Sequence, residues 1–322
     1  MRTFKIKGIS MEVTRIAYGC MGIGGAWDAT PLTDQTRKDA MLAVHAALDQ
    51  GINFFDHADI YGRGKAEEAF SQVWRDRPSL RQSVIVQTKC GIRFENDPVP
   101  GVPLRYDYSH DHIMRAVEGS LRRLGTDYVD ILLLHRPDAL VEPQEVARAF
   151  DRLSADGKVR CFGVSNHSAW QIELLKRWVT QRLVVNQLEV NVVHNQLVNA
   201  GVSVNQDQPA MPTHGEGTLE YCRLNDITIQ AWSPLAHGAF AKQSNERATK
   251  TAEVAEALAR QKGVSVEAIL VGWLLRHPAG IQPVIGTTKP DRIKAACQAD
   301  SVELTREEWY QLFTAGRGGR VA

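Results

Sequence analysis

The sequence predicts a (β/α)8 TIM barrel preceded by a short N-terminal β-hairpin. Short apolar stretches alternate with segments of helical periodicity eight times along the 322 residues. Such alternation indicates parallel strands joined by helical crossovers. Eight units in a chain of this length favour a closed barrel over an open sheet. Because no linker-like break in composition interrupts the alternation, we expect residues 1–322 to form a single domain.

The strands are expected where apolar runs end at a turn or before a helix. Residues 3–13 alternate polar and apolar side chains around Gly8, which indicates a small hairpin before the main fold. The eight expected barrel strands are residues 15–19, 53–56, 84–89, 128–135, 161–165, 184–189, 228–232 and 282–285.

Helices are expected between these strands, because apolar residues recur there at helical spacing. Gly51 is a suitable end for the first helix, and Ser109 a suitable N-cap for the third unit's helix. The expected helices are residues 36–50, 65–77, a segment starting after 109, 142–155, 168–179, 217–224, two within 250–276, and 290–298. Residues 92–108 and 194–215 are expected to be loops, and the glycine-rich tail 316–320 to be flexible.

The composition excludes several classes of protein. Hydrophobic residues make up 43% and charged residues 23%, which is typical of a globular protein with a large core. A net charge of +1 argues against a nucleic-acid or membrane-surface partner. Five cysteines without a CxxC pair support neither a disulfide framework nor a zinc site. No signal segment or transmembrane run is present, so we expect a cytoplasmic protein. No pattern indicates an oligomeric state.

Three ionisable side chains lie at the ends of neighbouring expected strands. Asp56, Lys89 and His135 end the second, third and fourth strands, and Tyr61 follows Asp56 on the next loop. Functional groups of a barrel gather at this end of the strands. Each residue alone would suit a turn, a solvated rim or a structural role. Together they predict a site, because charges buried in one place need one another as partners.

These residue types suit proton transfer to a carbonyl oxygen. A phenol has a pKa of about 10, too high for efficient proton exchange at neutral pH. A Lys89 ammonium, held charged by Asp56, would lower the pKa of Tyr61. His135 could then hydrogen-bond a carbonyl oxygen. Such a set can protonate a developing alkoxide, which carbonyl reduction by a hydride donor requires.

Motifs along almost the whole chain resemble those of the aldo-keto reductases, and most nearly the bacterial oxidoreductases of that family's general carbonyl-reducing branch. The matching segments, in the family's order, are Asn53–Gly62, Thr88–Lys89, Asp130–Pro137, Gly157–Asn166, Trp232–Leu235 and Gly286–Lys289. The resemblance implies reduction of aldehydes or ketones to alcohols by an NADPH-dependent oxidoreductase. In that reaction Tyr61 would be the general acid, with Asp56 and Lys89 tuning its pKa and His135 orienting the carbonyl.

The resemblance also implies an extended NADPH across the barrel mouth. The residues it assigns to this cofactor are, from nicotinamide to adenosine, Ser165, Asn166 and Gln187 for the carboxamide, Trp232 under the ring, Ser233, Pro234 and Leu235 at the pyrophosphate, and Gly286, Thr287, Thr288, Lys289 and Arg292 at the adenosine and its 2′-phosphate. Independently of the resemblance, two cations beside a glycine at a helix start suit a phosphate. An ordinary helix entry with exposed basic residues would look the same.

Two features depart from the family pattern or leave the substrate open. Ala295 and Ala296 stand where many relatives place polar groups on the adenine, and the 194–215 loop is longer than usual. The small-molecule carbonyl substrate is expected among loops 23–28, 92–108 and 194–215. Trp27 could form a wall of that pocket or simply pack in its loop.

Two patterns of other protein classes are excluded by their surroundings, and one alternative function is consistent with the same family. Tyr61 and Lys65 match the YxxxK spacing of short-chain dehydrogenases, but two glycines between them indicate a loop, and no GxGxxG fingerprint is present. The segment 110–112 contains two histidines and an aspartate but lacks a further ligand, so no metal is expected. An alternative function is a nucleotide-binding regulatory subunit of the same family without turnover; NADPH binding with no carbonyl turnover would distinguish it.

Overall fold

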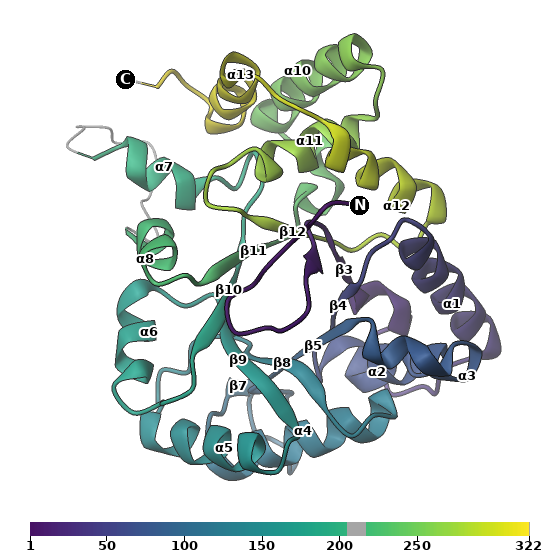
Figure 1. Cartoon of the computed structure of the whole chain (residues 1–322), viewed down its shortest axis with the longest axis vertical. Coiled ribbons are helices and arrows are strands. Elements are labelled where there is room, and N and C mark those ends of the chain that lie inside the picture. Colours follow the sequence, from purple (N-terminus) through teal and green to yellow (C-terminus); the bar gives the residue numbers. More distant parts are fainter. Residues whose placement is uncertain (205–216, 322) are drawn as a thin grey trace.

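Eight parallel strands close into a barrel with helices around it, as Figure 1 shows. The structure is a computed structural model that describes residues 1–204 and 217–321. The barrel strands in chain order are β3 (Ala17–Gly19), β4 (Phe54–Asp56), β5 (Ile85–Cys90), β8 (Val129–Leu134), β9 (Val159–Ser165), β10 (Leu183–Glu189), β11 (Thr228–Trp232) and β12 (Gln282–Ile285). Strand β12 pairs with β3 and closes the barrel. The predicted fold class and all eight predicted strands are confirmed.

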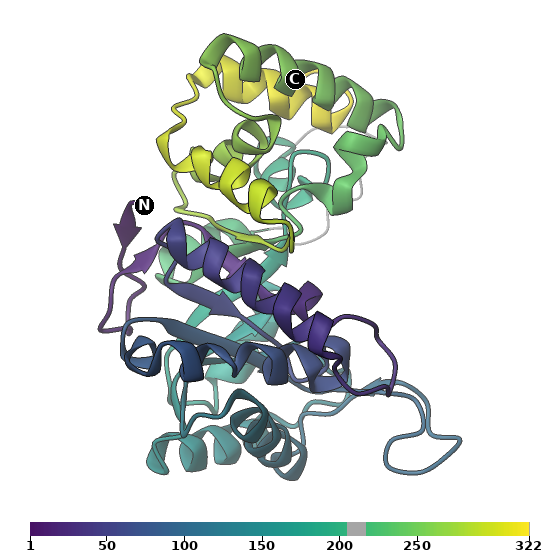
Figure 2. The same cartoon turned by 90° about the vertical axis from the view of Figure 1, so that its right-hand side faces the viewer.

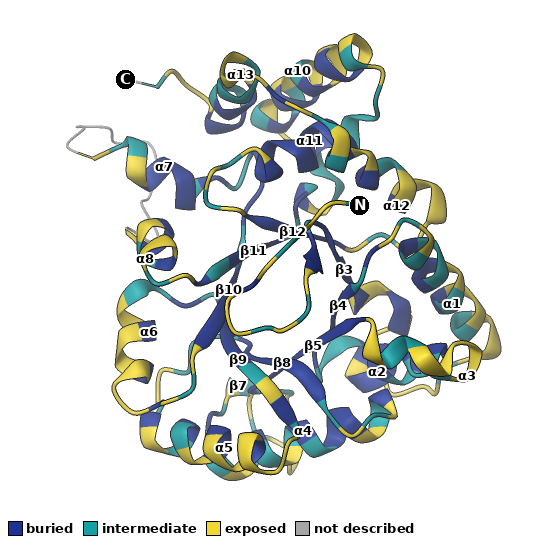
Figure 3. Cartoon of the chain, viewed as in Figure 1, coloured by how far each residue is buried: buried dark blue, intermediate teal, exposed yellow. Residues whose placement is uncertain are grey.

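The outer layer consists of helices that pack on the barrel or on one another (Figure 3). They are α1 (Asp34–Asp49), α2 (Lys65–Phe70), α3 (Val73–Asp76), α4 (His110–Leu124), α5 (Pro143–Ala155), α6 (Ala169–Lys176), α7 (Gln196–Val202), α8 (Thr218–Leu224), α9 (Ala239–Lys242), α10 (Glu246–Lys262), α11 (Val266–Leu275), α12 (Pro290–Cys297) and α13 (Arg306–Arg317). The predicted cap is present, because the Ser109 side chain accepts a hydrogen bond from the His112 amide. None of the helices described here has the length and apolar character needed to cross a membrane.

The N-terminal hairpin closes one end of the barrel. Strands β1 (Thr3–Phe4) and β2 (Val13–Thr14) pair antiparallel, which confirms the predicted hairpin. Ile6 and Val13 pack with Phe54 and Ile131 in one buried cluster, so the hairpin covers the apolar end of the barrel interior. Figure 2 places the hairpin and the loop of residues 92–108 at opposite ends of the molecule.

The segment 92–108 contains a short hairpin rather than only loop. Strands β6 (Ile92–Arg93) and β7 (Arg105–Tyr106) pair antiparallel beside the mouth of the barrel. The prolines of this segment indicate a loop by composition, and the two-residue strands are too short to give a periodic pattern.

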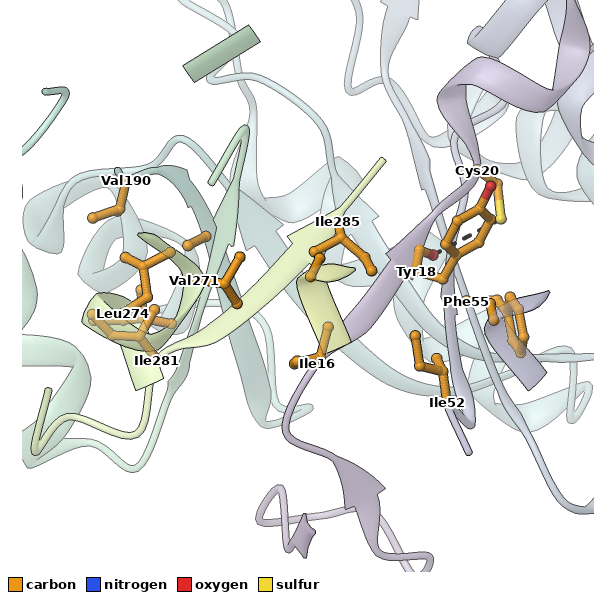
Figure 4. Packing of buried hydrophobic residues seen from close by; sticks show 14 of the residues in the cluster. Ile16, Tyr18, Cys20, Ile52, Phe55, Val190, Val271, Leu274, Ile281 and Ile285 are labelled. Carbon is orange, nitrogen blue, oxygen red and sulfur yellow. Dashed lines mark hydrogen bonds between the residues drawn. The ribbon is translucent and has the colours of Figure 1, made fainter. Parts of the chain in front are cut away.

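Helix α11 is buried between the barrel and the outer helices, which explains its continuous apolar sequence. Trp273 of α11 stacks on Trp309 of α13 at 5.0 Å between ring centroids. Each indole N–H of this pair donates to the other residue's carbonyl oxygen, at 3.2 and 3.0 Å. Figure 4 shows the neighbouring core, where Tyr18 and Ile285 lie on paired strands.

Two sequence-based expectations about the C-terminal half were wrong. The part of the 194–215 loop that the structure describes includes helix α7, and the remainder, 205–215, lies outside the described residues. The tail expected to be flexible begins inside helix α13, where Arg317 is 7% exposed and donates to the Asn199 side chain at 2.7 Å. Gly316 allows this end of α13 to approach the chain at Val192, because a Cβ there would come within 2.0 Å of the Val192 carbonyl oxygen.

Candidate active site

The strand ends carry polar side chains into the barrel because side chains alternate along a strand. Positions 85, 87 and 89 of β5 therefore share one face, and the inward face of β4 includes Phe54 and Asp56. Phe54 and Ile85 form the apolar layer next to the hairpin. The polar residues follow toward the mouth, where the C-terminal strand ends meet. The sequence-predicted residues thus converge at one end of the barrel.

Asp56, Lys89 and Tyr61 form a connected buried group. The Lys89 ammonium donates to both Asp56 carboxylate oxygens, at 2.8 and 2.7 Å, and to the Tyr61 hydroxyl at 3.0 Å. It also donates to the His57 carbonyl oxygen at 2.9 Å. Lys89 is 0% and Asp56 2% exposed, so each charge depends on the other for its stability.

The direction of these hydrogen bonds leaves the Tyr61 proton free. An ammonium can only donate, so the Tyr61 oxygen must accept in its contact with Lys89. The phenol hydrogen therefore has to point elsewhere. Tyr61 lines a cavity at the barrel mouth, and its hydroxyl is placed to donate to a group bound there.

The pKa of Tyr61 differs from the sequence-based prediction in its net direction. Burial raises the pKa of this phenol above its usual value, and the Lys89 charge offsets that rise only in part. For Lys89, burial alone would lower the pKa, but Asp56 and then Tyr61 raise it on balance. The lysine therefore stays charged, and the phenol keeps its proton at neutral pH.

His135 lies in the same cavity wall as a neutral imidazole. Burial, followed by the charges of Lys89 and Arg136, holds the pKa of His135 well below its usual value. Its ring is 5.9 Å from the Tyr61 ring between centroids, edge to face. The Nδ1 atom is buried without a hydrogen-bond partner, so we assign the proton to Nε2. A neutral Nε2–H can donate to a carbonyl oxygen.

A row of buried glutamines supports Asp56 from inside the barrel. Gln87 Nε2 donates to Asp56 Oδ1 at 2.6 Å and to Gln230 Oε1 at 2.8 Å. Gln230 Nε2 donates to Gln282 Oε1 at 2.8 Å, and Gln282 Nε2 donates to the Thr14 carbonyl oxygen at 2.7 Å. We call Gln87, Gln230 and Gln282 the glutamine row.

The two ends of the glutamine row fix the orientation of every amide in it. A backbone carbonyl at Thr14 and a carboxylate at Asp56 can only accept hydrogen bonds. Gln282 must therefore turn its NH2 group toward Thr14, and Gln87 must donate in both directions. Gln87 Oε1 is accordingly left buried without a partner. Gln87 Oε1 lacks a hydrogen-bond partner because the Gln87 amide is oriented to donate its N–H to Asp56.

Replacing Gln87 with methionine should lower both stability and catalytic rate. The variant removes a buried donor to the Asp56 carboxylate, a loss of about 1–3 kcal/mol in the free energy of unfolding. Gln282→Met is the matched control, because it interrupts the row at its other end and leaves the Gln87–Asp56 bond in place. Urea unfolding should show both variants destabilised, while kcat falls mainly for Gln87→Met. Equal loss of kcat would contradict a specific role of Gln87 at Asp56.

A cavity of 690 Å³ opens above these residues at the barrel mouth. Its wall includes Asp56, Tyr61 and His135, together with apolar side chains of Ile60 and Ile92. Trp27 also lines it, with its ring 6.3 Å from that of Tyr61 between centroids, edge to face. A cavity of this size is typical of small-molecule sites. Lys89 lies beneath the wall, where it contacts the lining residues Tyr61 and Asp56.

Most of the residues expected at the cofactor also line this cavity. They are Ser165, Asn166, Gln187, Trp232, Ser233, Pro234, Leu235, Gly286, Thr287 and Arg292. Thr288 and Lys289 are exposed beside it but are not part of its wall. Tyr18 supports this side from below, donating to the Thr287 carbonyl oxygen at 3.2 Å. The contacts of these residues with a cofactor stay a prediction.

Asn166 links three strands and fixes Trp232. Its backbone is left-handed, with a φ of 61°. The amide donates to the His135 carbonyl oxygen at 3.2 Å and to Ser165 Oγ at 2.8 Å, and its oxygen accepts from Trp232 Nε1 at 3.1 Å. The Gln187 amide in turn donates to Gln230 at 3.0 Å. These amides therefore already have protein partners, and Asn166 holds the Trp232 ring in place.

Lys65 has different partners from Lys89, as expected. Its ammonium donates to Asp28 at 3.0 Å and to the Thr30 carbonyl oxygen at 3.0 Å. This fixes the loop after Trp27, whereas Lys89 contacts Tyr61. Within residues 1–204 and 217–321, no group of three side chains suited to bind a metal occurs.

Sequence reasoning missed several residues of the site. In the sequence, each glutamine of the row appears only as a polar residue within an apolar strand. That pattern does not show which face of the strand the glutamine occupies. Arg136, His237 and Lys242 also line the cavity. Arg136 directly follows His135, but the direction of its side chain depends on packing that the sequence does not reveal.

Sequence comparisons relate the chain to one family over nearly its whole length. A model described as the aldo/keto reductase family matches residues 15–315. A protein of Agrobacterium fabrum called 6-dehydroglucose reductase is 36% identical over 313 residues, covering 97% of each chain. An uncharacterized oxidoreductase of Bacillus subtilis, YcsN, is 37% identical over 302 residues, covering 92% of this chain and 94% of that protein.

A solved structure with the same architecture is an aldo-keto reductase from Klebsiella pneumoniae in complex with NADPH. Its TM-score is 0.74 at 24% identity, and the match covers 97% of this chain and 94% of that one. This likeness shows the shared barrel fold.

Proposed function

The chain belongs to the aldo/keto reductase family, and from that premise we propose that it reduces aldehyde or ketone carbonyls to alcohols with NADPH. The observation that carries the proposal is the hydrogen bond from Lys89 to the Tyr61 oxygen. It leaves the phenol hydrogen for a group in the cavity, whose wall also includes the neutral His135. This arrangement supports a reductase rather than a regulatory subunit that only binds a nucleotide.

The cavity has the chemical groups that a nicotinamide cofactor needs. Its wall offers the Trp232 ring as a flat face and Ser165 and Asn166 as polar groups, and it includes the cations Lys242 and Arg292. Cations of this kind suit phosphates. The residues therefore fit the cofactor. When bound, reduced nicotinamide supplies the hydride for the carbonyl carbon.

The protein's own groups would act on the carbonyl oxygen. His135 donates from Nε2 to that oxygen and holds it beside Tyr61. As negative charge develops on the oxygen, Tyr61 donates its proton. The Lys89 charge, held in place by Asp56, stabilises the phenolate that results. Asp56, Lys89 and Tyr61 would thus lower the activation barrier of carbonyl reduction, because they stabilise a negative charge that develops only during the reaction.

A turnover assay tests this proposal directly. The protein is mixed with NADPH and a panel of aldehydes and ketones, and loss of the reduced-nicotinamide absorbance is followed. Turnover of at least one carbonyl, with formation of the matching alcohol, is expected. Tight NADPH binding without any turnover would instead support the alternative, a nucleotide-binding regulatory subunit.

The preference for NADPH over NADH should depend on Lys289 and Arg292. Both are exposed at the start of α12, and Arg292 is also 3.6 Å from Glu267. Lys289→Ala combined with Arg292→Ala should weaken NADPH binding by about 10- to 100-fold, with little effect on NADH, because charge-assisted bonds to the 2′-phosphate are lost. Lys294→Ala, an exposed cation on the same helix, is the control. Equal loss for both cofactors would mean that the 2′-phosphate binds elsewhere.

A further inference from the structure

Arg136 lies in the wall of the cavity with an unused charge. It follows His135 at the end of β8 and lines the same cavity as Tyr61. It is half-buried, and its guanidinium carbon lies 5.5 Å from the centroid of the Trp232 ring, within the range of a cation–π contact. Its hydrogen bonds are made by its main chain, so within the described part of the chain the guanidinium has no hydrogen-bond or ion-pair partner.

The main chain of Arg136 is held rigidly. Its amide donates to the Tyr108 hydroxyl at 3.1 Å, and that hydroxyl donates to the Arg136 carbonyl oxygen. Tyr108 is buried against Gly91, where a Cβ would come within 2.1 Å of the Tyr108 ring. One buried phenol therefore fixes the backbone on both sides of the arginine. The guanidinium is presented to the cavity from a preorganised base.

The other charges of the wall already have a role or a partner. Asp56 is neutralised by Lys89. Lys242 of α9 and Arg292 of α12 are the two cations that suit the phosphates of the proposed cofactor. Arg136 lies next to His135, the residue proposed to bind the carbonyl oxygen. Among the described residues of the wall, it is the cation that has neither a partner nor a proposed role. An unpaired charge in a partly buried wall is costly, and a bound anion would remove that cost.

Resting on the proposed carbonyl reduction, we propose that Arg136 binds a carboxylate of the substrate. The preferred substrates are then aldehydes or ketones that carry a carboxylate at a distance from the carbonyl. A planar guanidinium offers two parallel N–H groups, which match the two oxygens of a carboxylate. The apolar side chains of Trp27, Ile60 and Ile92 in the same wall suit the spacer between the two groups.

The test compares two aldehydes of nearly the same shape. In para-carboxybenzaldehyde and para-nitrobenzaldehyde the group opposite the carbonyl is planar with two oxygens, but only the first is anionic. We measure kcat/KM for each with NADPH, in the wild type, Arg136→Met and Arg136→Lys. The different intrinsic reactivities of the two aldehydes cancel when their ratio is compared between proteins. Glyceraldehyde serves as a neutral hydroxyaldehyde, and NADPH affinity is measured for each variant.

We expect Arg136→Met to lower the carboxy-to-nitro ratio by about 10- to 100-fold, because a charge-assisted pair is lost. The loss should be in kcat/KM for the carboxylate alone, with the nitro compound, glyceraldehyde and NADPH affinity nearly unchanged. Arg136→Lys should retain part of the preference through its charge, and it keeps the test open if the methionine variant does not fold.

Other outcomes overturn the inference. Equal loss for all three aldehydes would mean that Arg136 only supports Trp232, and loss for glyceraldehyde alone would mean that it binds hydroxyl groups. Loss of NADPH affinity with an unchanged ratio would assign the guanidinium to the cofactor. A wild type that reduces neutral aldehydes but disfavours the carboxylate would contradict this inference alone. A wild type that reduces no carbonyl would overturn the proposed function together with it.

Discussion

Replacing Tyr61 with phenylalanine should lower kcat for carbonyl reduction by about 10²- to 10⁴-fold, the range that a general acid contributes. The variant removes the hydroxyl that Lys89 contacts, while the ring can keep its contacts with Trp27 and His135. NADPH affinity should stay near that of the wild type, because the phenol hydroxyl is assigned to proton transfer. Stopped-flow turnover and a fluorescence titration with NADPH measure the two quantities.

Tyr221→Phe is the matched control for this experiment. Its hydroxyl lies on α8 and bonds with Glu173 and Lys176, away from the cavity. That variant should keep both kcat and cofactor affinity. If Tyr61→Phe loses cofactor affinity but reduces bound carbonyls at the normal rate, the assignment of Tyr61 as general acid is wrong.

Replacing Lys89 with methionine should destabilise the fold and abolish activity together. The Asp56 carboxylate would remain buried without its cation, and breaking a buried ion pair from one side costs about 3–5 kcal/mol in the free energy of unfolding. Tyr61 would also lose the charge that stabilises its phenolate. Urea unfolding and NADPH turnover on the same preparation measure both effects.

Lys65→Met provides the comparison for stability. Lys65 is also buried, but its partner Asp28 has a side chain that is 53% exposed and stays solvated when the lysine is removed. We expect a loss of about 1 kcal/mol there. Similar destabilisation by both substitutions would show that packing of the lysine stems, rather than the stranded Asp56 charge, determines the cost.

The strands and the convergence of Asp56, Lys89 and His135 follow from the sequence for a simple physical reason. Parallel strands in a barrel all present their C-terminal ends to the same mouth, so a residue's place at a strand end is enough to locate it. Tyr61 follows because it is five residues beyond Asp56 on the adjoining loop. The proposed catalytic residues can therefore be located from the sequence without knowledge of distant packing.

Other features depend on contacts that a single sequence does not contain. Which face of a short strand Gln230 or Gln282 occupies depends on register. The net pKa of Tyr61 depends on burial as much as on Lys89. The end of helix α13 was expected to be flexible because three of the five residues 316–320 are glycine. The helix itself contains only Gly316, and Thr305 and Glu308 form a capping box that marks its start. The backbone position of Arg136 depends on its hydrogen bond to Tyr108, which lies 28 residues away in sequence.

The glutamine row has a consequence for how the enzyme would recover between turnovers. A carboxamide side chain neither takes up nor releases a proton near neutral pH, and beneath the row lie apolar side chains and the N-terminal hairpin. The Asp56–Lys89 pair is thus insulated from solvent on the barrel side. A proton that Tyr61 gives to a product must return through the mouth of the cavity, the route by which the alcohol leaves. Reprotonation and product release would then share one passage.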